Sequence, residues 1–140
     1  MPMIQVTVHR IGLDQNSDQA VILLGDLTRT TFIPIWVRTS EATAIAFPIQ
    51  GIESPRPMTA DLVVKVIDEF EADLVMVVVN DIRDDIFYAS LVLNKDGRLI
   101  EIDCRPSDAI AVALRKSAPI YVEEKVMVEA GISGDDSEIQ

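Results

Sequence analysis

Two short segments of the sequence each place an arginine, a serine and a carboxylate within four residues: Arg38-Thr39-Ser40-Glu41 and Arg105-Pro106-Ser107-Asp108. Arginine binds paired phosphate or carboxylate oxygens through parallel N–H groups, and a carboxylate supplies hard oxygen ligands or accepts a proton. Both segments fall where an apolar strand pattern changes to a helical one, and helix N-termini attract anions. These segments predict corners that hold an anion or a phosphate.

The same residues also have a purely structural interpretation. A serine at the start of a helix caps free backbone N–H groups, and an acid in the first turn complements the helix dipole. The arginine then simply pairs with that acid. Capping explains every residue of both segments, so the structural and the functional interpretations stay open on sequence grounds.

Four carboxylates occupy positions from which they could assist phosphodiester hydrolysis. Asp103 closes a predicted strand, Asp108 opens the next helix, and Glu41 and Asp61 stand at corresponding helix starts. Oxygen ligands of this kind suit Mg²⁺ or Mn²⁺, so Asp103, Asp108 and Asp61 are the candidate metal ligands. Their spacing matches no specific metal motif, and each is equally well explained by a cap or a salt bridge. No organic cofactor is expected.

The other reactive side chains are weaker candidates. His9 is the only histidine and lies on the polar face of the first predicted strand, which excludes a site with two histidines from one chain. Cys104 stands in an apolar strand without a neighbouring histidine, which favours burial over catalysis. Arg56 is a second arginine that could help Arg105 to hold a phosphate.

Composition sets the size and the surroundings of the protein. The 140 residues are 49% apolar, which suits one domain over residues 1–130 followed by an acidic flexible tail at residues 131–140. A net charge of −11, with 12 scattered lysines and arginines, counts against nucleic-acid binding driven only by the phosphate backbone. The single cysteine and the lack of a long apolar run indicate a cytoplasmic protein without a membrane segment.

Hydrophobic periodicity predicts how the elements follow one another. The sequence begins with three strands and contains a helix from Ser40 to about Gly51, which Pro48 should kink or shorten, and a second helix capped by Thr59. The apolar run at residues 73–80 is typical of a strand covered on both faces. A hairpin at residues 86–104, a helix from Ser107 to Lys116, a short strand and a short helix complete the expected elements.

An internal repeat relates two parts of the chain. Shifting the sequence by 67 positions aligns residues 33–49 with residues 100–116 without a gap. Both copies read as a strand, the Arg-x-Ser-acid segment and an alanine-rich helix, and each follows another apolar strand. We therefore predict an α+β fold in which two duplicated β-β-α units share a mixed sheet or half-barrel, with three main helices.

Several segments resemble the bifunctional nuclease (BFN) domain family. Residues 103–111, DCRPSDAIA, are similar to its D-x-R-P-S-D-A-I-A signature, and residues 56–62, RPMTADL, resemble its R-P-x-T-x-D-L motif. Glu41 to Ala46 resembles its first helix and Phe87-Tyr88-Ala89 its F-Y-A strand. The resemblance covers about residues 3–128 and implies nuclease activity on DNA and RNA. Several family members carry histidine where this chain has Ala60.

The hypothesis that follows is a nuclease acting on DNA and/or RNA with the help of Mg²⁺ or Mn²⁺. Its catalytic candidates are Asp103, Arg105, Ser107, Asp108 and Glu41. The alternative is a non-enzymatic regulatory module that binds an anion or a protein partner, which the acidic charge favours. A homo-oligomer is compatible with either, because short apolar strands leave edges for a second subunit.

Overall fold

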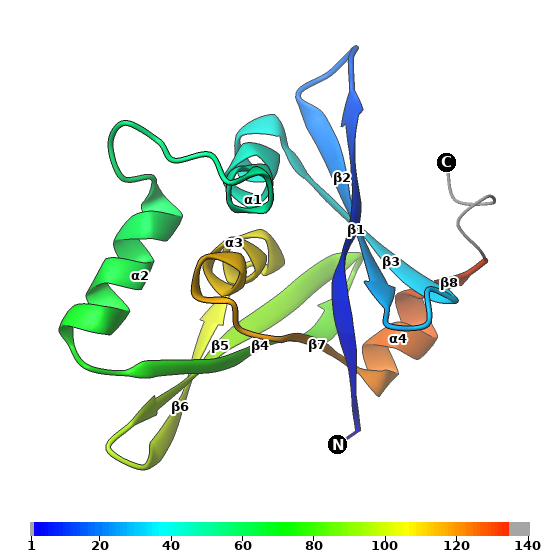
Figure 1. Cartoon of the computed structure of the whole chain (residues 1–140). Helices are drawn as coiled ribbons and strands as arrows, with labels where there is room; N and C mark the ends of the chain where they lie inside the picture. The colour runs from blue at the N-terminus through cyan, green and yellow to red at the C-terminus, as the bar shows by residue number, and fades with distance from the viewer. Residues whose placement is uncertain (1, 135–140) are drawn as a thin grey trace.

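The computed structural model describes residues 2–134, which form eight strands and four helices (Figure 1). The strands are β1 (Met3–Asp14), β2 (Gln19–Asp26), β3 (Thr31–Arg38), β4 (Asp73–Arg83), β5 (Ile86–Lys95), β6 (Arg98–Cys104), β7 (Ile120–Glu123) and β8 (Ile132–Ser133). The helices are α1 (Thr39–Gln50), α2 (Thr59–Glu69), α3 (Pro106–Lys116) and α4 (Glu124–Ala130).

All eight strands belong to one mixed sheet with the order β6-β5-β4-β7-β1-β2-β3-β8. Strands β4 and β7 run parallel, whereas the other neighbouring strands run antiparallel. The sheet is open, since its two ends are β6 and β8. The predicted α+β class and mixed sheet are confirmed, as are three main helices, because α4 has only seven residues.

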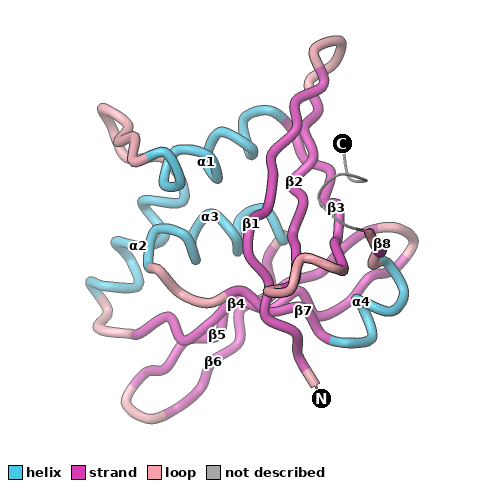
Figure 2. Tube along the Cα trace, turned by 45° about the vertical axis from the view of Figure 1, so that its right-hand side comes forward, coloured by secondary structure: helices cyan, strands magenta, loops and turns pink. Residues whose placement is uncertain are grey.

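The two predicted β-β-α units lie toward opposite ends of the sheet. Strands β2 and β3 form an antiparallel pair that leads into α1, and β5 and β6 form an antiparallel pair that leads into α3. Helices α1 and α3 contact each other on one side of the sheet (Figures 1 and 2). This arrangement brings the starts of both helices together. A duplicated origin of the two units stays a prediction.

The middle of β4 is covered on both faces. Helix α3 packs against one face of this strand, and α4 contacts it from the side of the sheet opposite to α1, α2 and α3 (Figures 1 and 2). Three consecutive residues, Val77, Val78 and Val79, are therefore all buried. This confirms the interpretation of the apolar run as a strand between two layers.

The helix caps differ from those expected. The N-cap residues are Arg38, Met58 and Arg105, so Ser40, Thr59 and Ser107 lie inside the first turns of their helices. In α1 and α2 the acid at the third helical position accepts a hydrogen bond from the N-cap N–H: Glu41 from Arg38 and Asp61 from Met58, each at 2.8 Å. These carboxylates satisfy the N-cap N–H groups, whereas the expected hydroxyl caps do not form.

Helix α1 continues past Pro48 to Gln50, and Gly51 terminates it with φ 69°. Pro48 therefore does not shorten the helix, and the alternative expectation of a kink at Pro48 stays a prediction. At the other end of the chain, Ile132 and Ser133 pair with Phe32 and Thr31 as β8, although they belong to the segment expected to be a flexible tail. The rest of that prediction, at residues 135–140, lies outside the described residues.

Candidate functional site

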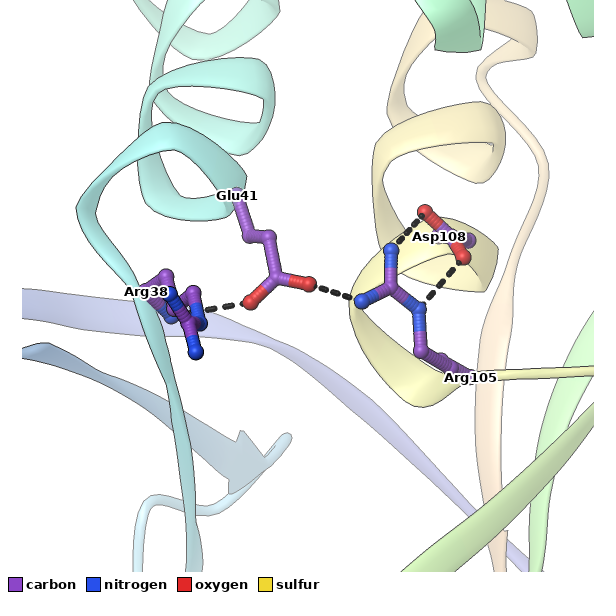
Figure 3. Close-up of polar contacts among 4 residues, drawn as sticks. All are labelled: Arg38, Glu41, Arg105 and Asp108. Carbon is purple, nitrogen blue, oxygen red and sulfur yellow. Dashed lines mark hydrogen bonds and ion pairs between the residues drawn. The ribbon is translucent and has the colours of Figure 1, made fainter.

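Arg105 holds two carboxylates from different helices (Figure 3). Its Nε donates to Asp108 Oδ2 at 2.9 Å and its Nη2 donates to Asp108 Oδ1 at 3.1 Å, which makes a bidentate pair. Its Nη1 donates to Oε2 of Glu41, 64 positions earlier in the sequence. We call Glu41, Arg105 and Asp108 the arginine corner.

The arginine corner is assembled by the two helix starts. Asp108 is in the first turn of α3, three residues after Arg105, and Glu41 is at the corresponding position of α1. The other oxygen of Glu41, Oε1, accepts the backbone N–H of Arg38, which fixes the orientation of the carboxylate toward Arg105 (Figure 3). The structure thus joins the two repeated segments through an arginine of one unit and an acid of the other.

The guanidinium of Arg105 keeps binding capacity. Three of the five N–H groups of an arginine are used in these contacts, so two remain. The side chain of Arg105 is 65% exposed and that of Asp108 is 52% exposed, whereas that of Glu41 is only 19% exposed. Hydrogen bonding to Asp108 raises the pKa of Arg105 above its ordinary value, so the group is a permanent cation.

Arg105 and Asp108 lie on the rim of an apolar pocket of about 460 Å³ between α2 and the end of the sheet. Apart from these two residues, its lining is Thr59, Ala60, Val63, Val66, Ile67, Phe70, Ala72, Leu91, Leu93, Ile102, Cys104 and Val112. Ala60, at the position where several BFN family members carry histidine, therefore faces the same space as the arginine corner. A ligand in this apolar pocket would meet a cation and a carboxylate at its mouth.

Cys104 lines the apolar pocket as a neutral thiol. Burial raises the pKa of the Cys104 thiol to about 11, and the charges of Asp108 and Asp103 act in the same direction. Arg105 therefore does not activate this thiol. Because the thiolate is the nucleophilic form, Cys104 is unsuited to nucleophilic catalysis near neutral pH.

Asp103 and Ser107, two site residues predicted from the sequence, do not line the apolar pocket beside Arg105 and Asp108. Ile102 and Cys104 face the apolar pocket, so Asp103 between them points to the opposite face of β6, where it is exposed. Ser107 is only 6% exposed. No hydrogen bond within residues 2–134 involves its hydroxyl group.

Asp61 belongs to a different cluster. Its Oδ1 accepts a hydrogen bond from Nε of Arg115 at 2.7 Å, and the Arg115 side chain is 10% exposed. This hydrogen bond from Arg115 holds the pKa of the Asp61 carboxyl below its ordinary value. Arg56 lines a second pocket on this other side of α2, so Arg56 and Arg105 line different pockets.

The sequence profile of the bifunctional nuclease domain matches residues 22–135, which include the second β-β-α unit, the first from within β2 onward, and the whole arginine corner. The chain belongs to the bifunctional nuclease domain family. The resemblance inferred from the short motifs is thereby confirmed.

Relatives of this bifunctional nuclease domain include an uncharacterized protein and proteins named bifunctional nucleases. An uncharacterized protein of Mycobacterium tuberculosis strain H37Rv is 41% identical over 128 residues, covering 91% of this chain and 76% of the relative. Bifunctional nuclease 2 of Oryza sativa subsp. japonica is 29% identical over 116 residues, and bifunctional nuclease 1 of the same subspecies is 25% identical over 122 residues. These two matches cover 81% and 85% of this chain but only 36% and 37% of the plant proteins.

The carboxylates that the structure describes, in residues 2–134, do not form a metal cage. Within residues 2–134, no three histidine, cysteine, aspartate or glutamate side chains are grouped so that they could hold a metal ion. Glu41 and Asp108 share the single positive charge of Arg105, and Asp61 is paired with Arg115. The donor set as it stands therefore does not fit an all-protein Mg²⁺ or Mn²⁺ site.

Sequence reasoning had found the members of the arginine corner but not their connection. The repeat placed Glu41 and Asp108 at equivalent positions. If α1 and α3 had been predicted to lie side by side, the contact of both acids with Arg105 could have been inferred. It missed Arg115, whose role depends on three helices.

None of the helices formed by the described residues combines the length and the apolar character needed to cross a membrane.

Proposed function

We propose that this bifunctional nuclease domain hydrolyses phosphodiester bonds in DNA and/or RNA at the arginine corner. The observation that carries the proposal is the exposed Arg105 guanidinium held between the carboxylates of Glu41 and Asp108. Membership of the family supports the reaction class, and the names of the plant relatives agree with it. The cluster pairs a phosphate-binding cation with a potential proton acceptor, the two functions that the reaction needs.

Each residue of the arginine corner has a distinct role in this proposal. The two N–H groups of Arg105 that remain free bind a non-bridging phosphate oxygen and stabilise the charge that develops on it. Asp108, the more exposed acid, accepts a proton from the attacking water as the water oxygen bonds to phosphorus, and passes it to the sugar oxygen that leaves as its P–O bond breaks. Glu41 keeps the guanidinium in place, because its carboxylate is itself fixed by the Arg38 N–H.

The apolar pocket accommodates the nucleoside next to the phosphate. Its volume of about 460 Å³ lies within the usual range for small-molecule sites. Phe70 lines it with a side chain that is 70% exposed, so a ring is available for a base to stack on. A cation at the mouth and an aromatic ring along the wall suit an extended single strand better than a stacked duplex.

Metal assistance is a separate part of the proposal. A Mg²⁺ or Mn²⁺ ion bound mainly through substrate phosphates and water would supply positive charge at the reacting group, as is common for Mg²⁺. Cleavage rates measured in Mg²⁺, in Mn²⁺ and in EDTA test whether a metal ion is needed. Cytoplasmic location and homo-oligomerisation stay predictions.

The decisive experiment measures cleavage of single- and double-stranded DNA and RNA by purified protein. We expect Arg105→Ala and Asp108→Asn to lower the rate by about 100-fold or more, since a general base or an oxyanion-binding group contributes on that scale. Asp81→Asn is the matched control, because it also removes one acid from an arginine–carboxylate pair, that of Asp81 and Arg83. Equal cutting by all four proteins would refute the assignment of the site.

A non-enzymatic binding module is the second candidate. It is favoured by the net charge of −11 and by the absence of a three-ligand metal cluster within residues 2–134. In that case no variant and no metal would produce cleavage, while a ligand would still bind in the apolar pocket and protect Cys104 from thiol reagents.

A further inference from the structure

A second depression lies on the other side of α2 from the apolar pocket. It has a volume of about 720 Å³ and is bounded by the loop at residues 51–58, the end of α1, one side of α2 and the end of α3. Side chains of α2 and its C-cap divide between the two sites: Asp61, Val64 and Lys65 face this depression, whereas Val63, Val66 and the C-cap residue Phe70 face the apolar pocket. We call this depression the basic groove.

Among the residues that line the basic groove, cations outnumber acids, although the protein as a whole has a net charge of −11. Its charged lining consists of Arg56, Lys65 and Arg115 against Glu53 and Asp61, which leaves one net positive charge. Arg115 and Asp61 neutralise each other in a close ion pair of 2.7 Å. The net positive charge of the lining therefore comes from Arg56 and Lys65, less the one negative charge of Glu53.

Arg56 and Lys65 are available for a ligand. Both are exposed, and neither makes a hydrogen bond or close ion pair within the described part of the chain. Lys65 acts on Asp61 only through its charge. By contrast, Arg83 and Arg105 are each held by an acid within hydrogen-bonding distance. Two such cations facing one groove suit anion binding, because no close ion pair has to be broken.

The rest of the groove suits a sugar–phosphate chain. Proline residues at positions 48, 55 and 57 restrict the backbone around it, so its shape is preorganised. Phe47 and Leu114 add apolar surface, on which the non-polar parts of a nucleotide can pack. A groove with this lining can follow an extended strand and hold its phosphates at one side.

We propose that the basic groove is a phosphate-binding subsite for a single nucleic-acid strand, in which Arg56 and Lys65 contact backbone phosphates away from the arginine corner. The inference rests on the proposed nuclease function for its choice of nucleic acid as the ligand. It adds phosphate contacts on the side of α2 opposite to the proposed cleavage site. It also explains how an acidic protein retains a nucleic acid, since a local pair of free cations replaces a general positive field.

The test measures binding separately from cleavage. A fluorescent single-stranded oligonucleotide of about twelve nucleotides, oligo-dT or oligo-U, is titrated by anisotropy in EDTA between roughly 50 and 200 mM salt. The test variant is Arg56→Gln with Lys65→Gln. The control is Arg98→Gln with Lys125→Gln, which removes two exposed cations outside the groove and gives the same net charge.

We expect the groove variant to weaken binding by about 10-fold or more and to reduce the salt slope by about 1.4, as for two lost phosphate contacts on a single strand. The control should change affinity less than about 2-fold. Equal losses in both variants, unchanged affinity of the groove variant, or failure of the wild-type protein to bind would overturn the proposal.

The proposed function can fail without the subsite failing. If the groove variant loses binding while no protein cleaves any substrate, the subsite stands and the nuclease assignment falls. If cleavage depends on Arg105 and Asp108 but binding does not depend on Arg56 and Lys65, the nuclease stands and the subsite falls.

Discussion

The guanidinium of Arg115 replaces the backbone donor that Pro48 lacks. In a helix the N–H of residue 48 would bind the carbonyl of Ala44, but proline has no N–H. Nη1 of Arg115 donates to this carbonyl oxygen at 2.7 Å and to that of Ala111 at 2.9 Å. Pro48 is tolerated inside α1 because α3 supplies the missing hydrogen bond. In the internal repeat, Pro48 and Arg115 occupy equivalent positions.

Arg115→Met should destabilise the protein by about 3 kcal/mol, measured by urea unfolding. The change leaves the carbonyl of Ala44 without a donor and Asp61 without its partner, and charged hydrogen bonds contribute on this scale. Pro48→Ala provides the matched test of the relationship. In that background the backbone N–H introduced by the substitution can bind the carbonyl of Ala44, so Arg115→Met should cost about 1 kcal/mol less. Strictly additive effects would contradict this account.

The ion pair of Asp61 and Arg115 should make stability depend on acid pH. The folded pKa of Asp61 is lowered, so its stabilisation is fully present above the unfolded pKa of about 3.9 and is lost as pH falls toward the folded value. Asp61→Asn should therefore be less stable than wild type at pH 7, with a gap that narrows below about pH 4. Asp18→Asn, at an exposed position, is the control. A gap of constant size down to low pH would disprove the linkage.

Cys104 should react slowly with a disulfide reagent at pH 8. Its pKa of about 11 leaves roughly one hundredth of the thiolate that an ordinary cysteine would have. The rate should be at least about 10-fold below that of the urea-unfolded chain and should rise as the pH approaches the thiol pKa. Asp108→Asn should speed the reaction, because the charge of Asp108 helps to raise the thiol pKa. A thiol that reacts as fast when folded as when unfolded would show an accessible, unperturbed Cys104.

Glu41 should behave as a positioning residue if the proposed nuclease activity is present. Glu41→Gln keeps the size of the side chain and leaves Arg105 paired with Asp108 through two hydrogen bonds. Its effect on cleavage should be smaller than that of Asp108→Asn, about 10-fold against 100-fold, and should be mainly in kcat. The fall of kcat at acid pH, the acidic limb of the pH profile, should disappear only in Asp108→Asn. If Glu41→Gln were the one that removed this limb, Glu41 and not Asp108 would be the proton acceptor.

The sequence predicted the elements better than their connections. The apolar run of Val77 to Val79 and the hairpin of β5 and β6 follow from local patterns, which hydrophobic periodicity reports directly. The N-caps were placed one or two residues too late, because hydroxyl groups were expected to cap where the carboxylates of Glu41 and Asp61 do so. Ser40 or Thr59 as an N-cap would accept N–H groups further along the helix than those that Glu41 and Asp61 accept, and local chemistry alone allowed either start.

The candidate site was predicted in composition but only partly in arrangement. Arg105 and Asp108 are adjacent because one turn of helix brings them together, and a sequence motif contains that information. Asp103 was grouped with them by proximity in sequence, although strand alternation sends it to the other face of β6. The cross-helix contact of Glu41 and the two pockets flanking α2 depend on how α1, α2 and α3 pack, which no single motif encodes.

The place of β7 in the sheet affects how the chain folds. This strand separates β4 from β1 and is hydrogen-bonded to both, with Ile120 opposite Val6 and Val77. Each hairpin and its helix can form from neighbouring residues, but the two halves join only when residues 120–123 have arrived. During synthesis on the ribosome, β1 must therefore wait with one edge unpaired until more than a hundred further residues are made. The closing of this long loop should set the folding rate and leave that edge open to aggregation in the meantime.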